Sequence, residues 1–211
     1  MTTAKDLFII AMDPRPDRSV GQGDLSLALA GAELIDLIGA HTVTLDGERI
    51  VPDGARSASD DQLLGEASAA LARDVPYESV EDWLWRRGRD LSAAYQSALE
   101  GDGQLTRERR RSPFGPARVE LVDSAARRRA LSRWEADEPV LAALASAVGI
   151  RGGRSGEDEG DADDGSDGDA VVTSEVTAVL AVVNDAVMEL EAVRQRRNIE
   201  KAAFANIWRG P

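Results

Sequence analysis

The stretch DLSLALAGAELIDLIG at residues 24–39 decides the fold of this chain. Its large apolar residues recur at spacings of three and four, which predicts a helix. Gly and Ala fill many of the other positions, and a helix with so many small residues is ordinarily a tightly packed one. We expect Asp24 to cap this helix, because an Asp side chain accepts hydrogen bonds from the free N–H groups at a helix start. Gly39 is the expected end, since Gly readily adopts the backbone conformation that closes a helix.

Most other segments have the same helical spacing. A first helix, capped by Thr3, carries the apolar run at residues 7–12 and stops at Pro14. The last helix has an apolar stripe formed by Val176, Leu180, Val183, Val187, Leu190 and Val193. In chain order, the remaining predictions are helices at 63–72, 80–87 and 91–99, one that Asp123 or Ser124 caps, an Ala-rich one that follows Asp137 and Pro139 and ends at Val148, and the last helix, which runs from about Thr173 toward Trp208.

Two segments are predicted to form β-hairpins instead. Residues 42–51 flank Asp46-Gly47, a pair that tolerates the positive φ angles of a two-residue turn. Residues 105–122 predict a second hairpin with a long tip, because 110–116 are rich in turn residues and 118–122 alternate. The predicted fold is mainly α, a packed helical core with two short β-hairpins, one of them protruding. We treat residues 1–211 as a single helical domain.

An acidic segment at residues 151–170 interrupts this domain. No large apolar residue occurs between Arg151 and Asp169, so we expect a disordered linker. Eight carboxylates fall within residues 157–169 and supply much of the net charge of −13. A calcium loop is not predicted, because no frame has Asp-x-Asp-x-Asp-Gly with a Glu six residues beyond that Gly. Two roles stay open: masking of arginine surfaces when no membrane is present, and keeping the chain soluble.

Composition excludes several classes of function. The chain has no Cys, so it has no disulfide, no thiolate metal site and no cysteine nucleophile, and the cytoplasm is the default location. Its apolar runs at 7–12 and 176–183 are too short to cross a membrane, so any contact with a bilayer is expected to be peripheral. The negative net charge argues against nucleic acid as a partner, because phosphate binding needs a basic field.

The sequence gives little support for catalysis. Its single imidazole, His41, is expected in a surface turn at the entrance of the first hairpin. Glu33 and Asp36 share a helical face, but such pairs arise by chance in an acidic chain. No nucleophile elbow, Walker loop or dinucleotide fingerprint is present. We therefore predict no catalytic residue, no metal site and no cofactor.

A group of arginines follows two tryptophans. Arg86, Arg87 and Arg89 come directly after Trp83-Leu84-Trp85, which puts bidentate anion donors beside aromatic residues that favour an interface. This pattern predicts an anion-binding patch. The alternative is a buried Trp83 with solvated arginines behind it.

A second group of arginines belongs to the predicted hairpin at 105–122. Phe114 lies between Pro113 and Gly115 at its tip. A basic stem with an apolar tip suits an anionic bilayer surface, although the same hairpin could pair with a second copy of the chain. The arginines that flank this tip are Arg107, Arg109, Arg110, Arg111 and Arg118.

The arginines of two later helices have simpler interpretations. Arg127, Arg128, Arg129 and Arg133 can extend the basic surface or neutralise Glu135 and Asp137. The basic residues of the last helix are Arg194, Arg196, Arg197 and Arg209, and they fit a helix end whose cations complement the dipole. We do not count this helix end as a site.

The order of these motifs resembles the Golgi phosphoprotein 3 family over most of residues 4–150. Leu-Ala-Leu-Ala-Gly-Ala-Glu-Leu-Ile-Asp-Leu (27–37) precedes a short hairpin, and Leu-Glu-Gly-Asp-Gly-Gln-Leu (99–105) opens a longer, Arg-rich one. The resemblance implies an all-α core with a protruding hairpin and recognition of phosphatidylinositol 4-phosphate at membranes. It also implies adaptor work on membrane-protein clients, and no catalysis.

The resemblance also suggests site residues. The family's headgroup site uses a Trp before the small-residue helix, an Arg within it and two Arg residues three apart on a later helix. The matching positions here are Gly21, Ala30, Arg89 and Ser92, so Arg89 alone keeps the family residue. Nearby arginines offer a more general anion site, and the predicted headgroup residues are Arg89, Arg86, Arg87, Ser92 and Arg18.

These observations predict a non-catalytic peripheral membrane protein that binds anionic phospholipid headgroups. The alternative is a cytosolic protein-interaction scaffold that kept the fold but lost the lipid site. If the chain is a peripheral membrane protein, the expected partners are an anionic phospholipid and a membrane-protein client. Self-association through the hairpin at 105–122 is a further option.

Overall fold

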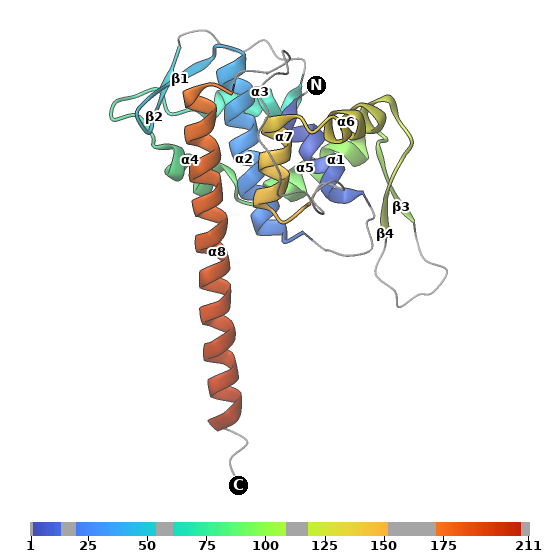
Figure 1. Ribbon diagram of the computed structural model, residues 1–211, viewed down its shortest axis with the longest axis vertical. Coiled ribbons are helices and arrows are strands. Elements are labelled where there is room, and N and C mark those ends of the chain that lie inside the picture. Colours follow the sequence, from blue (N-terminus) through green and yellow to red (C-terminus); the bar gives the residue numbers. More distant parts are fainter. Residues whose placement is uncertain (1, 14–19, 54–60, 109–117, 152–171, 208–211) are drawn as a thin grey trace, which may run out of the picture.

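The computed structural model describes residues 2–13, 20–53, 61–108, 118–151 and 172–207. It confirms the predicted fold class, a mainly α chain with two short antiparallel hairpins, of which β3–β4 stands out from the helices (Figure 1). In chain order the elements are α1 (Thr3–Met12), α2 (Gln22–Gly39), β1 (Val43–Asp46), β2 (Arg49–Pro52), α3 (Gln62–Ala69), α4 (Val80–Arg87), α5 (Leu91–Gly101), β3 (Leu105–Glu108), β4 (Arg118–Leu121), α6 (Ala125–Glu135), α7 (Pro139–Ala147) and α8 (Ser174–Ile207).

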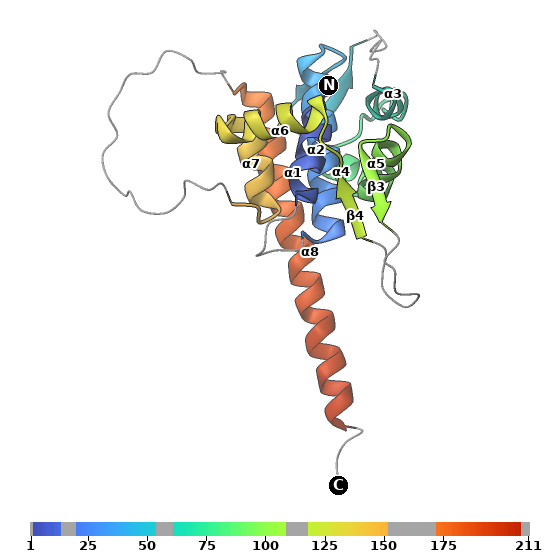
Figure 2. The same cartoon turned by 90° about the vertical axis from the view of Figure 1, so that its right-hand side faces the viewer.

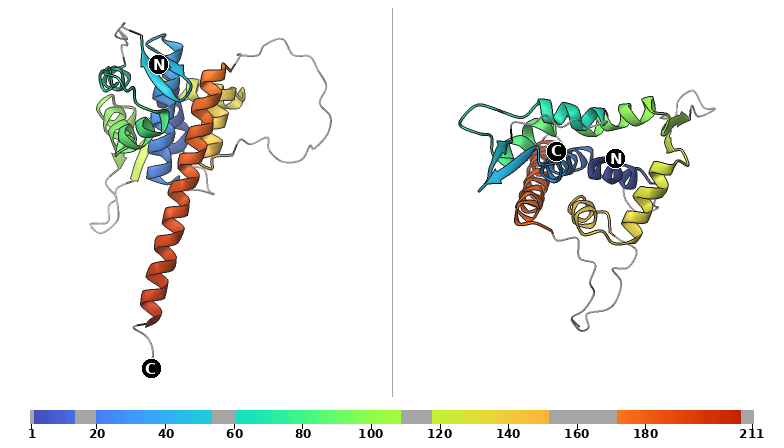
Figure 3. Two further views of the ribbon diagram at one scale, coloured as in Figure 1. Left: turned by 90° about the vertical axis from the view of Figure 1, so that its left-hand side faces the viewer. Right: turned by 90° about the horizontal axis from the view of Figure 1, so that it is seen from above.

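Helix α2 forms the centre of the core. Every residue from Leu25 to Ile38 except Asp36 is buried, and the helix packs against α1, α3, α4, α5, α7 and α8. Seen from above, α1 and α2 lie in the middle, with α3 and α5 along one side and α6, α7 and α8 on the others (Figure 3). The small residues make this arrangement possible. A Cβ on Gly31 would lie only 2.3 Å from Cγ2 of Val183 in α8.

The start of α1 differs by one residue from the prediction. Thr2 caps the helix in place of Thr3, and its Oγ1 accepts a hydrogen bond from Lys5 N at 3.3 Å. The carboxylate of Asp36 in α2 also accepts hydrogen bonds from the backbone N–H groups of Thr3 and Ala4, at 3.1 and 3.3 Å. A side chain from a neighbouring helix therefore completes this cap, and local sequence does not reveal it.

The start of α2 also differs from the prediction. Gly21 is the N-cap residue and the helix begins at Gln22, so Asp24 lies in the first turn and makes no capping hydrogen bond. Its carboxylate pairs with Arg194 of α8 at 2.6 Å. The prediction that Asp24 caps α2 is wrong, because a guanidinium from α8 binds the carboxylate that a cap would use.

The first hairpin is confirmed, with its turn one residue later than predicted. Asp46 pairs with Arg49, so Gly47 and Glu48 form the turn, and Gly47 has the positive φ of 59° that Gly adopts without strain. In the second hairpin Leu105 pairs with Leu121 and Glu108 with Arg118. Its tip, residues 109–117, lies outside the described residues.

The later helices largely follow the prediction. Ser124 caps α6 by accepting a hydrogen bond from Arg127 N at 3.1 Å. Helix α3 ends three residues earlier than predicted, at Ala69. Apart from Arg151, the predicted linker at 151–170 lies outside the described residues.

Helix α8 runs beside α2 and then continues past the core (Figures 1 and 2). Val183 of the predicted stripe is buried, whereas Val176, Leu180, Val187 and Leu190 pack against the core while only partly buried. Val179 and Ala186, which the stripe did not include, are also buried. The core-facing side of α8 is thus slightly rotated from the predicted one.

Candidate anion-binding site

A shallow pocket of about 360 Å³ opens where the first turns of α2, the α4–α5 turn and α8 meet. Arg89 and Ser92, both predicted headgroup residues, lie in its wall. The full lining is Gln22, Gly23, Ser26, Leu27, Trp85, Gly88, Arg89, Asp90, Ser92, Ala93 and Leu190.

The α4–α5 turn holds Arg89 in place. Gly88 ends α4 by donating a hydrogen bond to the Leu84 carbonyl at 2.9 Å. A Cβ at Gly88 would lie 2.5 Å from that same oxygen and 3.3 Å from the Ser26 carbonyl oxygen, so the turn needs Gly to lie this close to α2. Asp90, with a φ of 54°, then redirects the chain into α5. Arg89 therefore occupies an exposed corner between two helices.

Two helix N-termini face this pocket. The first turns of α2 and α5 both line it, and neither helix has a side-chain hydrogen bond at its N-cap residue, Gly21 or Asp90. At the start of α5, Ser92 N donates to the Ser26 hydroxyl at 3.0 Å. Partial positive charge at a helix N-terminus stabilises a nearby anion by about 0.3–1 kcal/mol. The pocket therefore favours a negatively charged group.

Two charged side chains at the rim, Arg89 and Asp90, have opposite effects on the binding of an anion. Within the part of the chain that the structure describes, Arg89 forms no ion pair, so its guanidinium can bind an anion without first breaking a contact. Asp90 lies beside it and opposes an anion. The Arg194–Asp24 pair lies next to Gly23 of the pocket wall: an added Cβ on Gly23 would be 2.9 Å from the Arg194 guanidinium, and one on Gly21 would be 3.3 Å from it.

The structure separates Arg86 from the pocket. Its Nε and Nη2 donate to the Glu78 carboxylate at 2.6 and 2.7 Å, and Nη2 also donates to the Ala70 carbonyl. The guanidinium lies 5.2 Å from the ring centroid of Trp83, which is fully buried as the alternative interpretation predicted. Arg86 thus holds the segment after α3 against α4.

Arg87 faces the core. Its guanidinium donates two hydrogen bonds to the fully buried Glu33 carboxylate, at 2.7 and 2.9 Å, and one to the Leu63 carbonyl. The Tyr95 hydroxyl donates to the same carboxylate at 3.1 Å. Of the three arginines predicted to form one patch, the pocket therefore receives only Arg89. Arg18 lies outside the described residues.

Burial sets the proton affinity of the carboxylates in α2. Loss of water raises the pKa of Glu33 above its ordinary value of 4.5, although Arg87 and Tyr95 act in the opposite direction. Burial also raises the pKa of Asp36, against the hydrogen bonds from Thr3 and Ala4. These groups hold α1, α4 and α5 against α2 and do not line the pocket. The pair expected by chance from the sequence therefore has a structural role.

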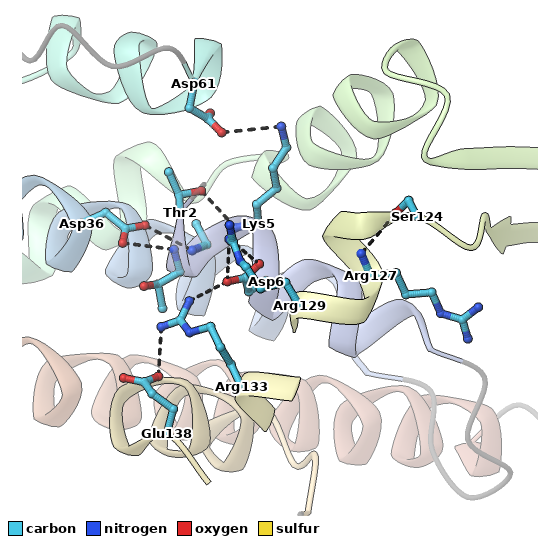
Figure 4. Close-up of polar contacts among 12 residues, drawn as sticks. Thr2, Lys5, Asp6, Asp36, Asp61, Ser124, Arg127, Arg129, Arg133 and Glu138 are labelled. Atoms are coloured by element: carbon cyan, nitrogen blue, oxygen red, sulfur yellow. Dashed lines mark hydrogen bonds and ion pairs between the residues drawn. The ribbon is translucent and has the colours of Figure 1, made fainter. Parts of the chain in front are cut away.

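The arginines of α6 bind carboxylates outside that helix, as Figure 4 shows for Arg129 and Arg133. Arg129 and Arg133 both donate to Asp6, a fully buried carboxylate in α1, and Arg133 also donates to Glu138. Arg127 pairs with Asp13 and Arg128 with Asp123. Neutralisation, rather than an extended basic surface, is therefore their role. Their partners are not Glu135 and Asp137.

Only the two strands of the second hairpin are among the described residues. Arg118 begins β4, opposite Glu108 of β3. Arg110, Arg111 and Phe114 lie outside the described residues, so their role at a membrane or between copies stays a prediction. His41 is exposed at the end of α2, with a φ of 52°.

A larger hollow of about 630 Å³ lies between α1, α3 and α5, but its charge suits an anion poorly. Lys5 projects into it and is held by Asp61 at 3.5 Å and Asp102 at 3.3 Å. Among the described residues, no group of three or more His, Asp or Glu side chains could hold a metal ion. Nor does any helix in the described ranges have the length and apolar character needed to cross a membrane.

Sequence reasoning found Arg89 and Ser92 but missed much of the pocket wall. Gln22, Gly23 and Trp85 were not predicted to meet there, and Leu190 is about 100 residues from Arg89 along the chain. The periodic spacing of α8 did identify Leu190 as a packing residue. Nothing in the spacing indicates that it packs beside Arg89.

Comparison with known proteins adds a family. The family model described as Golgi phosphoprotein 3 (GPP34) matches residues 4–190. A comparison with curated proteins found no match. The matched region includes the whole pocket, from Gln22 to Leu190, and ends within α8.

Proposed function

Because the chain belongs to the Golgi phosphoprotein 3 family, we propose that it is a non-catalytic peripheral membrane protein whose Arg89 pocket binds an anionic phospholipid headgroup. The observation that carries this proposal is the joint placement of Arg89 and the N-termini of α2 and α5 around one pocket. Phosphate is the group that such a set of donors recognises best.

The chemistry of the pocket suits a phosphorylated headgroup. Its volume of about 360 Å³ is within the usual range for a small-molecule site. Arg89 can donate two parallel hydrogen bonds to a phosphate, and Ser92 lies close enough in the wall to add a hydroxyl. The headgroup we propose is phosphatidylinositol 4-phosphate, as the family resemblance implies, with the protein at the cytoplasmic face of a membrane. Work as an adaptor for a membrane-protein client belongs to the same proposal.

Vesicle sedimentation tests the proposal. We expect the full chain to bind phosphatidylcholine vesicles that contain phosphatidylinositol 4-phosphate, more strongly than vesicles with phosphatidylserine at equal total charge. Arg89→Gln should weaken this binding about tenfold or more, because a charge-assisted hydrogen bond contributes about 1.5–3 kcal/mol. Arg73→Gln is the matched control, since Arg73 is also exposed but lies outside the pocket. Equal binding by the folded Arg89→Gln variant would remove the pocket from consideration.

A second candidate function is a cytosolic protein-interaction scaffold. It is favoured by the pairing of Arg86 and Arg87 with Glu78 and Glu33, which leaves Arg89 as the sole arginine of that group in the pocket. Under this alternative the folded wild-type chain binds none of the anionic vesicles at low ionic strength. The same sedimentation assay therefore separates the two functions.

A further inference from the structure

Helix α8 continues well beyond the body of the protein. Leu190 packs against the core, and Arg194 makes the last ion pair of α8 with another described element, through Asp24 of α2. The helix nevertheless runs on to Ile207. Figures 1 and 2 show this part projecting from the core in the direction in which strand β3 runs. We call residues 195–207 the α8 extension.

The α8 extension lies outside the region that the family shares. The family model ends at residue 190, one helical turn before Arg194. Packing does not account for the extension either, since every side chain described from Gln195 to Lys201 is exposed. Ile199 is 70% exposed. None of the described elements covers these seven residues, so their side chains are available for a contact beyond the described core.

The charge of the α8 extension is opposite to that of the chain as a whole. Its described side chains include Arg196, Arg197 and Lys201 against Glu200, whereas the chain carries a net charge of −13. Within the described residues, no carboxylate lies in salt-bridge distance of these three cations. The dipole interpretation of this basic segment is wrong, because the helix continues beyond it and has no basic residue in its last turn.

Two of these cations share a face with the pocket wall. Leu190, Arg194, Arg197 and Lys201 follow each other at spacings of four, three and four, which places them along one side of a helix. Leu190 lines the Arg89 pocket, and Arg194 packs beside it. Arg197 and Lys201 therefore continue the pocket's side of α8 beyond the core. Arg196 lies on a different side of the helix.

We infer that the α8 extension is a second contact with an anionic bilayer, made through Arg197 and Lys201 beside the Arg89 pocket. This inference rests on the proposed function. A helix rises 1.5 Å per residue, so Arg197 lies about 5 Å and Lys201 about 10 Å beyond Arg194 along the axis. Charges in physiological salt are screened over about 8 Å. Lys201 therefore lies more than one screening length beyond the last ion pair with the core, and Arg197 lies between Lys201 and the pocket. Contact of both cations with lipid phosphates would orient the pocket toward the bilayer.

A second copy of the chain fits this surface less well. Helices that pair with each other bury a continuous apolar seam at spacings of three and four. Between Glu191 and Lys201 the large apolar residues are Val193 and Ile199, and their six-residue separation puts them on different sides of the helix. Over residues 195–201, whose side chains the structure describes, the surface offers charge rather than an apolar seam. Its charge matches an anionic lipid surface.

Substitutions on two sides of α8 test the inference. In vesicle sedimentation with phosphatidylserine-containing vesicles, we expect Arg197→Gln to weaken binding about fivefold and Arg197→Gln with Lys201→Gln about 25-fold. Arg196→Gln removes the same charge from the same turn and should change binding less than twofold. Unchanged helicity by circular dichroism shows that each variant folds.

A fluorescence readout locates the contact directly. The chain has no Cys, so Asn198→Cys can carry a single environment-sensitive dye in the extension. Val75→Cys, at a position that is 79% exposed and far from α8 in sequence, serves as the control. Vesicles should shift the emission of the dye at position 198 to the blue and leave the dye at position 75 unchanged.

The outcomes separate this inference from the proposed function. Weaker binding by Arg89→Gln together with unchanged binding by the Arg197→Gln, Lys201→Gln variant overturns the inference alone. Equal losses from Arg196→Gln and Arg197→Gln also overturn it, since no particular side would then be in contact. If the wild-type chain binds no anionic vesicle, both the inference and the proposed function are overturned. Charge-dependent binding to duplex DNA without any vesicle effect would identify a nucleic-acid surface and overturn the lipid assignment.

Discussion

Glu33 shows how a single residue acquires its role from its neighbours. Its side chain is fully buried in α2, where Arg87 of α4 and Tyr95 of α5 both donate hydrogen bonds to it. Burial disfavours the charged carboxylate and raises its pKa, while both partners favour the charged form. The balance leaves the pKa above the ordinary value, so protonation of Glu33 is easier in the folded chain than in the unfolded one.

This shift predicts an unusual pH dependence of stability. At pH values between the ordinary pKa of 4.5 and the raised pKa of the folded state, Glu33 binds more protons in the folded chain than in the unfolded one. The contribution of Glu33 to the free energy of unfolding therefore grows as pH falls. It is lost as pH rises through the folded pKa. Glu33→Gln abolishes this titration and weakens the contact with Arg87, at a cost of about 1–3 kcal/mol at pH 7.

The measurement is urea unfolding of both proteins between pH 7 and 4.5. We expect the gap in unfolding free energy between wild type and Glu33→Gln to widen toward acid. A gap that narrows would mean that Arg87 lowers the pKa more than burial raises it. Glu81→Gln, which removes an exposed carboxylate from α4, should leave the gap to wild type nearly constant.

At the scale of elements, the contact between α2 and α8 depends on one missing side chain. Gly31 lies in the middle of α2, where Gly ordinarily costs about 1 kcal/mol relative to Ala. The position has no room for a methyl group, because a Cβ there would lie 2.3 Å from Val183. Close packing of α8 thus compensates for a residue that weakens the helix itself. The pocket depends on this contact, since α8 contributes Leu190 to its wall.

Ala substitutions distinguish helix propensity from overpacking, because the first raises stability and the second lowers it. Gly31→Ala should destabilise the protein by about 1–3 kcal/mol, because overpacking outweighs the gain in helix propensity. Gly65→Ala in α3 is the matched control: its Cβ would meet nothing within 4 Å, so thermal unfolding should show a small increase in stability. Gly31→Ala should destabilise the Val183→Ala variant less than it destabilises the wild type, because the smaller side chain at 183 leaves room for the added methyl group. No coupling between positions 31 and 183 would contradict the packing argument.

At the scale of the whole molecule, charge is distributed unevenly along the chain. The segment at 157–169 holds eight carboxylates, whereas the pocket and the α8 extension carry the exposed cations Arg89, Arg197 and Lys201. Binding to an anionic surface reflects the sum of these charges within a Debye length of the contact. Arginines paired inside the body, such as Arg87 and Arg133, add little to that sum.

Deletion of residues 157–169 is expected to strengthen binding to anionic vesicles at low ionic strength. The deletion removes eight carboxylates, which on the masking hypothesis repel the bilayer and compete for the cations. At high salt the two proteins should bind alike, because charges more than a few ångströms apart are then screened. Vesicle sedimentation across a salt series measures both limits. Equal affinity at low salt, with both proteins folded, would leave the segment the role of keeping the chain soluble.

The sequence by itself determined the identity and order of the helices and hairpins. Spacings of three and four placed α1 to α8 close to their observed limits, and Asp46-Gly47 located the first turn to within one residue. Ser124, one of the two residues predicted as the cap of α6, is the observed cap. These features depend on backbone preferences and on apolar spacing within a few residues, so the local sequence contains the information.

Only the tertiary structure decided which polar groups meet. Asp24 resembles a cap but binds Arg194 from a helix 170 residues later, and Asp36 completes the cap of another helix. Arg86, Arg87 and Arg89 are neighbours in sequence, yet they take three different surroundings. An ion pair or a pocket wall depends on distances between helices, and these are set by packing across the whole core. Neighbouring residues on a helix point in different directions, so a run of like residues does not by itself make a site.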